Sequence, residues 1–373
     1  MNEQSPRKLH IIIGTKAQLI KMAPVLHELQ KRGVDYNLVF TGQHHETIEE
    51  LRANFNIKQP DHVLYGKDVT GIGQMCFWFL QTLCLCIKNK KTVFGRVDKS
   101  HIFVVHGDTF SALLGALVGK ILRAKVAHVE SGLRSFNIWH PFPEEITRLG
   151  TFSLSDIYFC PNEWAVDNLK SFKGKKINTL YNTLYDALRI ATRSDETSMD
   201  TLAKKYNIPL NNYAVCTIHR FENIFNKARL EMIINYVREI AKDLPLLFVL
   251  HPPTVIQLNK FSLLALLEST ENIHLMPRFD YLSFIKIVAN SEFVISDGGS
   301  NQEETFYLGK PCILLRDKTE RKEGIGKNVV ISHYDRNIIL DFTKSYKSLA
   351  GKYIEEDVSP SQNIVDTLLE LTA

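Results

Sequence analysis

IFVVHGDTFSALLGALVGKI, residues 102–121, contains one complete strand–turn–helix unit. Apolar residues run to His106, a polar turn carries Asp108, and leucines then recur at helical spacing as far as Ile121. The same succession returns along the chain, which is typical of domains whose parallel strands are joined by helical crossovers. The sequence therefore predicts an α/β fold.

The apolar runs fall into two series that are separated near residue 183. The expected strands are residues 10–13, 36–40, 102–106, 126–129 and 157–160, and then 214–218, 246–250, 273–276, 293–296 and 312–315; helices are expected at 184–190, 230–244 and 364–371. We expect two Rossmann-like domains with parallel sheets that face each other across a cleft, residues 1–180 and 181–355. A C-terminal helix within residues 356–373 could pack back on the first domain.

The composition is that of a globular enzyme with nearly balanced charge. The 45 basic and 41 acidic residues leave a net charge of +4. They show no clustered basic stripe of the kind that nucleic-acid binders carry, so no nucleic-acid partner is expected. The six cysteines include no CxxC pair, which favours reduced, buried thiols over disulfides or a metal site.

The start of the chain is polar and lacks the pattern of a signal peptide. The longest apolar stretch, residues 75–87, is too short to span a bilayer, so it is predicted to be a core or dimer-interface helix. We therefore expect no stable membrane insertion and a cytoplasmic protein.

The first polar turn follows the first strand. Gly14 permits a sharp turn, and the N-terminus of the next helix would favour an anion, with Lys16 and Lys21 near it. A tight turn with solvated lysines is the alternative. The pattern is neither GxGxxG nor a Walker P-loop, and the second strand lacks a terminal acid, which disfavours a nicotinamide dehydrogenase. Pro24 is expected in the first turn of the helix, or at a kink in it.

Three carboxylates are candidates for acid–base work. Asp108 could transfer protons or simply cap the helix after it. Glu130 could have a pKa suited to catalysis, or it could pair with Arg134. Glu144 and its neighbour Glu145 are expected in a loop stiffened by prolines. If such groups converge, they suit proton transfer at carbon, which needs a base on one face and an acid on the other.

The second series carries groups suited to a nucleotide diphosphate. His219 and Arg220 could bind phosphates, because arginine offers a bidentate fork; a surface salt bridge between Arg220 and Glu222 is the alternative. Gly298 and Gly299 stand between a strand and a helix, where bare backbone N–H groups bind anions. Acids on that helix could accept hydrogen bonds from ribose hydroxyls.

Taken together, these motifs resemble the UDP-N-acetylglucosamine 2-epimerase family, whose fold is that of two-domain GT-B glycosyltransferases. The matches cover nearly the whole chain in order: GT at 14–15, KMAP at 21–24, QH at 43–44, HGDT at 106–109, HVE at 128–130, GLR at 132–134, PEE at 143–145, HR at 219–220, EN at 222–223, QEE at 302–304, LGKP at 308–311 and TER at 319–321.

The resemblance implies catalytic roles for Asp108, Glu130, Glu144 and His219. The implied UDP- or substrate-binding residues are Lys16, Lys21, Arg148, Arg220, Glu222, Asn223, Phe284, Gly298, Gly299, Ser300, Glu304 and Arg321. In this set the glycine loop would meet the phosphates, Glu304 the ribose and Phe284 the uracil. In the family a base removes the C2 proton and UDP leaves from the anti side. UDP then re-adds to the 2-acetamidoglucal after protonation from the opposite face.

The resemblance further implies a UDP-sugar substrate, no metal or nicotinamide cofactor, a homodimer, and a place in supplying precursors of cell-surface polysaccharides. The chain also departs from the family pattern. Lys16 and Phe221 stand where arginines are usual, and Ala17-Gln18 replaces Pro-Glu. Residues 298–301 read GGSN instead of SGGI, Lys322 replaces a proline, and residues 66–75 lack the basic motif that binds an activating UDP-sugar in some bacterial members.

Three other functions stay open. A hydrolysing 2-epimerase would release free sugar and UDP. A GT-B glycosyltransferase would need an acceptor groove, for which residues 75–87 are the one hint. A UDP-sugar-binding protein of weak activity would not need Asp108, Glu130, Glu144 and His219, so their presence argues against it.

Overall fold

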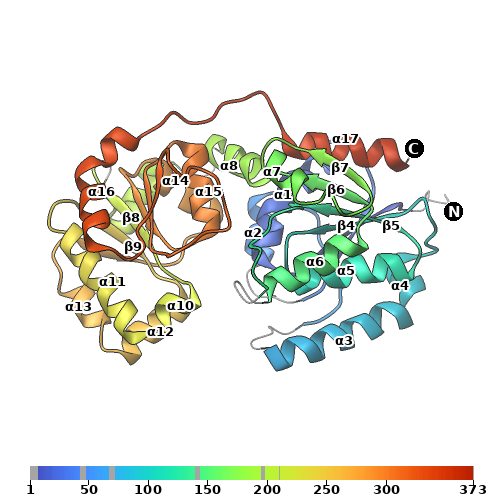
Figure 1. The fold of residues 1–373 in the computed structure, drawn as a ribbon, viewed down its shortest axis with the longest axis horizontal. Coiled ribbons are helices and arrows are strands. Elements are labelled where there is room, and N and C mark those ends of the chain that lie inside the picture. Colours follow the sequence, from blue (N-terminus) through green and yellow to red (C-terminus); the bar gives the residue numbers. More distant parts are fainter. Residues whose placement is uncertain are drawn as a thin grey trace. The chain divides into compact units, whose positions relative to one another are not determined.

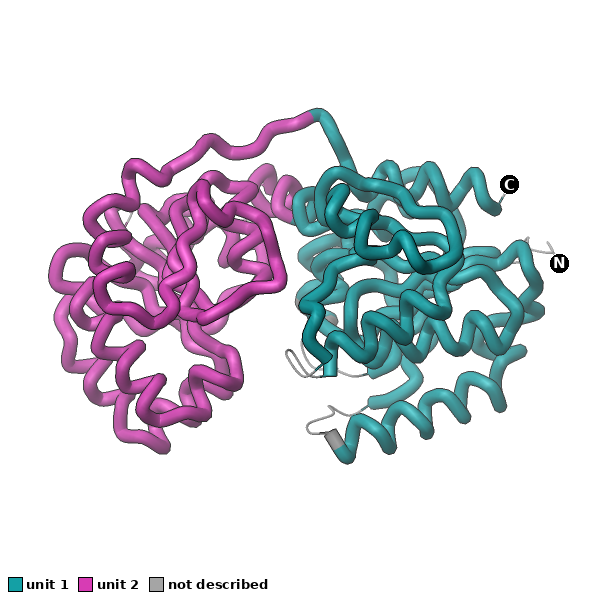
Figure 2. The backbone as a smooth tube through the Cα atoms, viewed as in Figure 1, with its two compact units in different colours: residues 1–187, 357–373 teal, residues 188–356 magenta. Residues whose placement is uncertain are grey.

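The computed structural model describes residues 7–42, 48–66, 72–138, 143–194, 198–209 and 211–372. The chain divides into two compact units, which Figure 2 colours separately. Unit 1 comprises Met1–Ala187 and Asp357–Ala373, and unit 2 comprises Leu188–Glu356. Both termini therefore belong to unit 1, and unit 2 is inserted between its two segments.

The described part of unit 1 forms a seven-stranded parallel sheet in the order β3-β2-β1-β4-β5-β6-β7 (Figure 1). Its strands are β1 (Leu9–Ile13), β2 (Tyr36–Phe40), β3 (His62–Val63), β4 (Ile102–His106), β5 (Lys125–Val129), β6 (Ile157–Cys160) and β7 (Lys175–Asn178). Its helices are α1 (Lys16–Lys31), α2 (Ile48–Asn54), α3 (Ile72–Lys88), α4 (Lys90–Phe94), α5 (Phe110–Ile121), α6 (Glu144–Leu154), α7 (Glu163–Asp167) and α17 (Pro360–Thr372), and α8 (Leu184–Arg193) leads into unit 2.

The described part of unit 2 forms a six-stranded parallel sheet in the order β10-β9-β8-β11-β12-β13. Its strands are β8 (Ala214–Thr217), β9 (Leu246–Val249), β10 (Ile273–Met276), β11 (Val294–Ser296), β12 (Cys312–Leu314) and β13 (Val329–Ile331). Its helices are α9 (Met199–Tyr206), α10 (Phe221–Ile224), α11 (Lys227–Ile240), α12 (Pro252–Lys260), α13 (Leu264–Glu268), α14 (Tyr281–Ala289), α15 (Gly299–Leu308) and α16 (Arg336–Leu349).

The central strands are the best predicted elements. β1, β2, β4 and β8 are buried at every position, because helices cover both faces of a parallel sheet, and this burial explains their unbroken apolar sequences. The predicted ends differ from the observed ends by one residue at several strands, and the helix expected at 230–244 is α11, which begins at Lys227 and ends at Ile240. The edge strands β3, β7 and β13 were not predicted: β3 and β7 are short and only partly apolar, and β13 is apolar but only three residues long.

Helix α1 corrects one expectation. The Thr15 side chain accepts a hydrogen bond from the backbone N–H of Gln18, so this capping box starts the helix at Lys16. Pro24 therefore lies inside the helix and not in its first turn. A proline there removes the backbone hydrogen bond to the carbonyl four residues earlier. Pro24 is buried.

Two helices cover the outside of unit 1. α17 packs against α1, and Arg32, the C-cap residue of α1, forms an ion pair with Asp366 of α17. α3 lies alongside α5 (Figure 1). Its inner side is anchored by Trp78, whose indole N–H donates to the Thr41 carbonyl at 3.2 Å. Of the helices that the structure describes, none has the length and apolar character needed to cross a membrane.

Candidate active site

In each unit, polar side chains gather where the strand order reverses. In unit 1 the reversal lies between β1 and β4, which are neighbours although they are not consecutive in sequence. In unit 2 it lies between β8 and β11. Ligands of open parallel sheets bind at the carboxyl ends of the strands beside such a reversal. Asp108 follows β4, whereas His219 and Asp297 follow β8 and β11.

Glu130 is the most constrained of the predicted acids. It comes directly after β5 and has a φ of +60°, a left-handed conformation that non-glycine residues seldom adopt. Its carboxylate forms an ion pair with the buried Lys21 and accepts a hydrogen bond from Asn182 Nδ2 at 2.7 Å. His106 Nε2 lies 3.4 Å from its other oxygen. The surrounding protein thus holds Glu130 in a strained position, which is characteristic of functional residues.

Arg134, the alternative partner considered for Glu130, forms its ion pair elsewhere. Arg134 pairs instead with Glu145, which is completely buried and also receives a hydrogen bond from the Ser135 backbone N–H at 3.0 Å. Burial by itself would raise the pKa of Glu145, but these hydrogen bonds and the charge of Arg134 outweigh it and lower the pKa. Glu145 is therefore an anionic anchor for the surrounding arginines, and it was not among the predicted site residues.

Asp108 and Arg148 form a second ion pair. Arg148 extends from α6 to the Asp108 carboxylate and lies 3.3 Å from Glu145. Thr147 donates to the backbone carbonyl of Asp108, so the first turn of α6 is joined to the turn after β4. Glu144 begins this helix; it was expected in a loop, but Glu144 and Glu145 occupy the first helical turn, where the helix dipole favours acids. Thr109, and not Asp108, caps α5.

The turn after β1 is tight, as predicted, but its amide groups are already occupied. A Cβ atom at Gly14 would lie 1.9 Å from Ser111 Oγ, so only glycine fits. The side-chain oxygen of Gln18 accepts from the backbone N–H groups of Gly14 and Thr15 at 2.8 and 3.1 Å. The same amide donates to the His106 carbonyl at 2.7 Å. Gln18 thus holds the turn against the end of β4, and the anion expected here would have to rely on lysine side chains.

Asp297 organises the corresponding turn of unit 2. It is completely buried and accepts hydrogen bonds from the backbone N–H groups of His219 and Arg220 and from Asn223 Nδ2, at 2.9 to 3.1 Å. His219 Nδ1 lies 3.3 Å from the same carboxylate, while 39% of its side chain is exposed. Asn223 also donates to the Leu315 carbonyl, so it holds the turn together from within. Asp297 positions His219, and no sequence motif singled it out for that role.

Arginines surround the glycine turn of unit 2. Arg316 Nη2 lies 3.1 Å from Glu320, and Arg321 Nη1 lies 2.5 Å from the buried Glu303. Burial would raise the pKa of Glu320, but the charges of Arg316, Arg321 and Arg220 outweigh it and lower the pKa to about 2. Glu320 therefore stays anionic among these three arginines, and Arg321 Nε would lie 2.7 Å from a Cβ atom at Gly299. The guanidinium groups offer the bidentate donors that suit a diphosphate, while Glu320, Glu303 and Glu222 balance their charge.

The remaining predicted residues lie on these same elements. Arg220 pairs with Glu222 at 2.5 Å, the surface interaction that was the alternative to phosphate binding. Lys16 is the first residue of α1, and the half-buried Phe284 lies on α14. Gly298 is the N-cap of α15, Gly299 and Ser300 are its first two residues, and Glu304 lies in its second turn. Gln43 and His44, which form one of the matched motifs, lie outside the described residues.

His251 is a further residue that the motif search missed. It follows β9, its Nε2 lies 3.0 Å from Thr217 Oγ1, and its ring centroid lies 4.9 Å from that of His219. Its only sequence signal was its place directly after a strand. The pair puts two imidazoles at the ends of the neighbouring strands β8 and β9.

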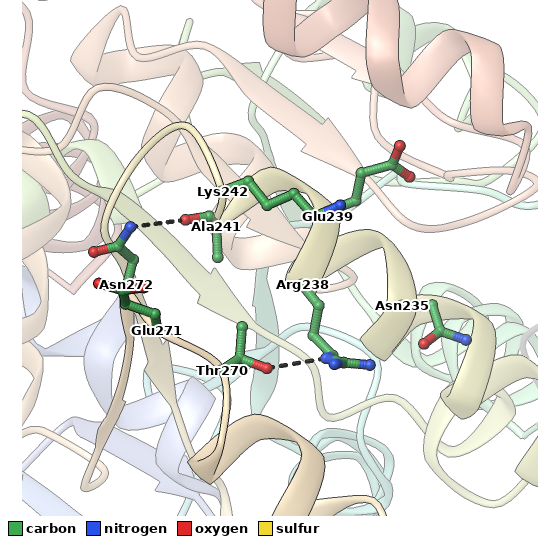
Figure 3. A pocket seen from close by; sticks show the side chains of 8 residues that line it. All are labelled: Asn235, Arg238, Glu239, Ala241, Lys242, Thr270, Glu271 and Asn272. Carbon is green, nitrogen blue, oxygen red and sulfur yellow. Dashed lines mark hydrogen bonds between the residues drawn. The ribbon is translucent and has the colours of Figure 1, made fainter.

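The hollow in Figure 3 is a different feature. It has a volume of about 560 Å³ and is lined by Asn235, Arg238, Glu239, Ala241, Lys242, Thr270, Glu271 and Asn272. These residues come from the end of α11 and from the segments before β9 and β10, so they lie at the amino ends of the strands. Arg238 there donates to Thr270 at 2.9 Å. The hollow is at the wrong edge of the sheet to share the chemistry of His219 and Asp297.

Comparisons with known proteins agree with this arrangement. The family model described as UDP-N-acetylglucosamine 2-epimerase matches residues 27–364. The UDP-N-acetylglucosamine 2-epimerase of Methanocaldococcus jannaschii is 34% identical over 342 residues, which cover 89% of this chain and 90% of that protein. A UDP-2,3-diacetamido-2,3-dideoxy-D-glucuronate 2-epimerase of Pseudomonas aeruginosa is 33% identical, with 94% of each chain covered.

Among solved structures, the UDP-GlcNAc 2-epimerase of Neisseria meningitidis bound to UDP-GlcNAc superposes with a TM-score of 0.82 at 30% sequence identity. The match covers 97% of this chain and 99% of that one. The GT-B-like fold expected from the sequence is therefore confirmed.

Proposed function

Because the chain belongs to the UDP-N-acetylglucosamine 2-epimerase family, we propose that it interconverts UDP-N-acetylglucosamine and UDP-N-acetylmannosamine, or the epimers of a closely related UDP-2-acetamido sugar. The protein is an isomerase that inverts one carbon, C2 of the sugar. Relatives named for two different UDP sugars are almost equally similar to it. The substituents at C3 and C6 are therefore the part of the substrate that experiment has to determine.

One observation carries this proposal. Asp108 and Glu130 follow neighbouring strands, and each is held by a cationic side chain that is itself about 95% buried, Arg148 and Lys21 respectively. Two carboxylates fixed at one sheet edge can act on opposite faces of a single carbon, one as base and the other as acid. Glu144, at the start of the helix that supplies Arg148, is the third candidate for proton transfer.

The proposed reaction has two halves. A carboxylate removes the C2 proton, the C1–O bond to UDP breaks, and the electron pair forms a C1=C2 double bond. A second group then protonates C2 from the other face, and a β-phosphate oxygen of UDP re-forms the bond to C1. The second half reverses the first, except that the proton reaches C2 from the opposite face. One proton is removed and one is returned, so the reaction consumes no proton and needs no oxidant.

We assign recognition of UDP to residues that bind anions and hydroxyls. His219, Arg220, Arg321 and the N–H groups at the start of α15 would stabilise the negative charge that grows on the leaving diphosphate. Glu304 would accept from the ribose, and Phe284 would lie against the uracil. Lys16, Glu222, Asn223 and Ser300 complete the proposed set.

The test is proton NMR after incubation with UDP-N-acetylglucosamine in deuterated water. We expect a UDP-manno product with deuterium at C2, and an equal mixture of substrates should show whether the 2,3-diacetamido-glucuronate is preferred. Free N-acetylmannosamine with UDP would indicate the hydrolysing reaction instead. Transfer of sugar to an added acceptor without C2 exchange would support a glycosyltransferase, and exchange with neither substrate would contradict the proposal.

We also propose that the protein is a homodimer, and the outer face of α3 supports this. Phe77 and Leu80 are 67% and 61% exposed, and Cys76, Cys84 and Ile87 share their side of the helix. An apolar patch of this kind is characteristic of interaction surfaces, and a two-fold dimer uses one patch twice. Leu80→Asp should therefore give a monomer in analytical ultracentrifugation. Ile256→Asp, a change at an exposed apolar residue of unit 2, is the matched control.

A dimer that survives Leu80→Asp would exclude this face as the interface. A thiol-specific crosslinker provides a second readout, because Cys84 of two copies would approach across such an interface. We place the protein in the cytoplasm. All six of its cysteines are free thiols, which fits a reducing compartment.

A further inference from the structure

A relay of hydrogen bonds runs from the glycine turn of unit 2 to Glu304. The backbone N–H of Gly298 donates to Ser296 Oγ at 3.0 Å. The Ser296 hydroxyl donates to Asn301 Oδ1 at 2.9 Å, and Asn301 Nδ2 donates to Glu304 Oε2, also at 2.9 Å. Every link has one donor and one acceptor in a consistent direction, which fixes the orientation of the Asn301 amide.

The relay decides which amides of the turn can meet a phosphate. Gly298 N–H is committed to Ser296, so the first N–H groups that α15 directs toward an anion are those of Gly299 and Ser300. Asn301 and Glu304 lie three residues apart on the same helix and face the same side. One short helix therefore carries both the phosphate-binding amides and the buried acid, with Asn301 between them.

Gly298 and Asn301 are sterically matched. A Cβ atom at position 298 would lie 2.6 Å from Asn301 Oδ1 and 2.9 Å from His219 Cε1. Any side chain at 298 would therefore push the Asn301 amide away from its place under the turn. The glycine at 298, where the resemblance leads one to expect serine, is explained by this packing.

We propose that Asn301 is a positioning residue that orients Glu304 for recognition of the ribose hydroxyls of a uridine diphosphate sugar. The inference rests on the proposed function for its ligand. Asn301 holds one carboxylate oxygen, and the buried Tyr281 contacts the same acid from α14. Without the amide, the Glu304 side chain loses a charge-assisted hydrogen bond and becomes free to rotate away from its ligand-binding orientation.

The relay includes the Gly298 N–H but not the N–H groups of Gly299 and Ser300. A change at Asn301 is expected to alter ribose recognition and to leave the contacts of the diphosphate with Gly299, Ser300 and Arg321 intact. If Asn301 merely supported the fold, replacing it would weaken the binding of the ribose and of the diphosphate equally. This difference separates the positioning role from a structural one.

The experiment is calorimetric titration of the wild-type protein and Asn301→Leu with UDP, 2′-deoxy-UDP, 3′-deoxy-UDP and inorganic pyrophosphate. For the wild type we expect UDP to bind about tenfold or more tightly than one of the deoxy nucleotides, because a buried carboxylate is left without its hydroxyl partner. In Asn301→Leu this ratio should fall to about 1–3 while pyrophosphate affinity changes less than about twofold. Asn290→Leu, a change at the end of α14, is the matched control.

The inference would be overturned if Asn301→Leu kept the wild-type preference for UDP over the deoxy nucleotide. It would also be overturned if the affinities for UDP and for pyrophosphate fell equally. If the wild type does not bind UDP at all, the proposed function fails with it, and that outcome is visible before any variant is compared. Gly298→Ser tests the relay independently, because the added side chain displaces the Asn301 amide. Gly298→Ser should lower the preference for UDP over the deoxy nucleotide, as Asn301→Leu does. The double variant, Gly298→Ser with Asn301→Leu, should lower this preference no further than either single change.

Discussion

The two units arrange the same kind of sheet for different chemistry. At the strand ends of unit 1, each acid faces a cation: Glu130 faces Lys21, and Asp108 faces Arg148. At the strand ends of unit 2, the buried Asp297 instead gathers backbone N–H groups, and arginines surround the glycine turn. The comparison teaches that the strand ends of one kind of sheet can present either carboxylates paired with buried cations or a buried carboxylate that binds backbone N–H groups. The difference depends on which helix side chains contact the residues at the strand ends.

The largest effect should come from the acids of unit 1. Asp108→Asn or Glu130→Gln should lower turnover by about 10²–10⁴-fold, because a proton-transfer group is lost, while the affinity for UDP changes little. Steady-state kinetics with calorimetry measures both quantities. Asp167→Asn, at an exposed acid of the same unit, is the control. Near-normal turnover in both variants would show that these carboxylates do not transfer the proton. It would also contradict the expectation that unit 1 governs turnover while unit 2 governs binding.

The corresponding change in unit 2 should affect binding. Asp297→Asn places an amide where three N–H donors converge, so His219 and Arg220 should lose their positions. We expect UDP affinity to fall by about 10–100-fold, the cost of leaving buried donors unsatisfied. Titration calorimetry checks this, with the exposed Asp317→Asn as control. Unchanged affinity would show that Asp297 has no part in nucleotide binding.

Low pH should destabilise unit 1 through its buried His128. Burial lowers the pKa of His128 from 6.5 to about 4, so His128 stays neutral in the folded protein. Its Nε2 faces the Gly107 carbonyl at 2.8 Å, and Glu130, Asp108 and Arg148 are the nearest charges. In the unfolded chain His128 takes up a proton below pH 6.5. Stability is therefore lost as the pH falls from 6.5 toward 4, by about 3 kcal/mol for this residue.

Tryptophan fluorescence can follow this effect, because Trp78, Trp139 and Trp164 all belong to unit 1. Urea midpoints measured between pH 7 and 4.5 should fall for the wild type. They should fall less steeply for His128→Gln, which keeps a donor for the Gly107 carbonyl. Equal slopes for the two proteins would mean that His128 does not titrate as its burial implies.

The smallest effect is expected at the hollow of unit 2. Arg238→Ala combined with Lys242→Ala changes the amino-terminal edge of the sheet, away from Asp297. Turnover and UDP affinity should stay within about twofold of the wild type, as is usual for surface changes. Kinetics on this double variant therefore provides a baseline for the substitutions at the opposite edge. A large loss of activity would show that the hollow takes part in function.

Much of this protein could be predicted from its sequence. Buried parallel strands are apolar throughout, so β1, β4, β8 and β11 stood out with nearly their observed bounds. Polar residues directly after them identified Asp108, His219 and the glycine turn. The family followed from the order of many weak motifs, and its match was confirmed. A local pattern suffices here because strand, turn and helix are each encoded within a few neighbouring residues.

Only the tertiary structure decided which side chains meet. Arg134 is four residues from Glu130, yet it pairs with Glu145, because the left-handed turn at Glu130 directs that carboxylate toward Lys21. The Asp297 hydrogen bonds likewise join it to His219 and Asn223, which lie 78 and 74 residues away in the sequence. Local sequence determines where each strand ends. The packing of distant helices against the sheet determines which charge, amide or hydroxyl each of those ends will face.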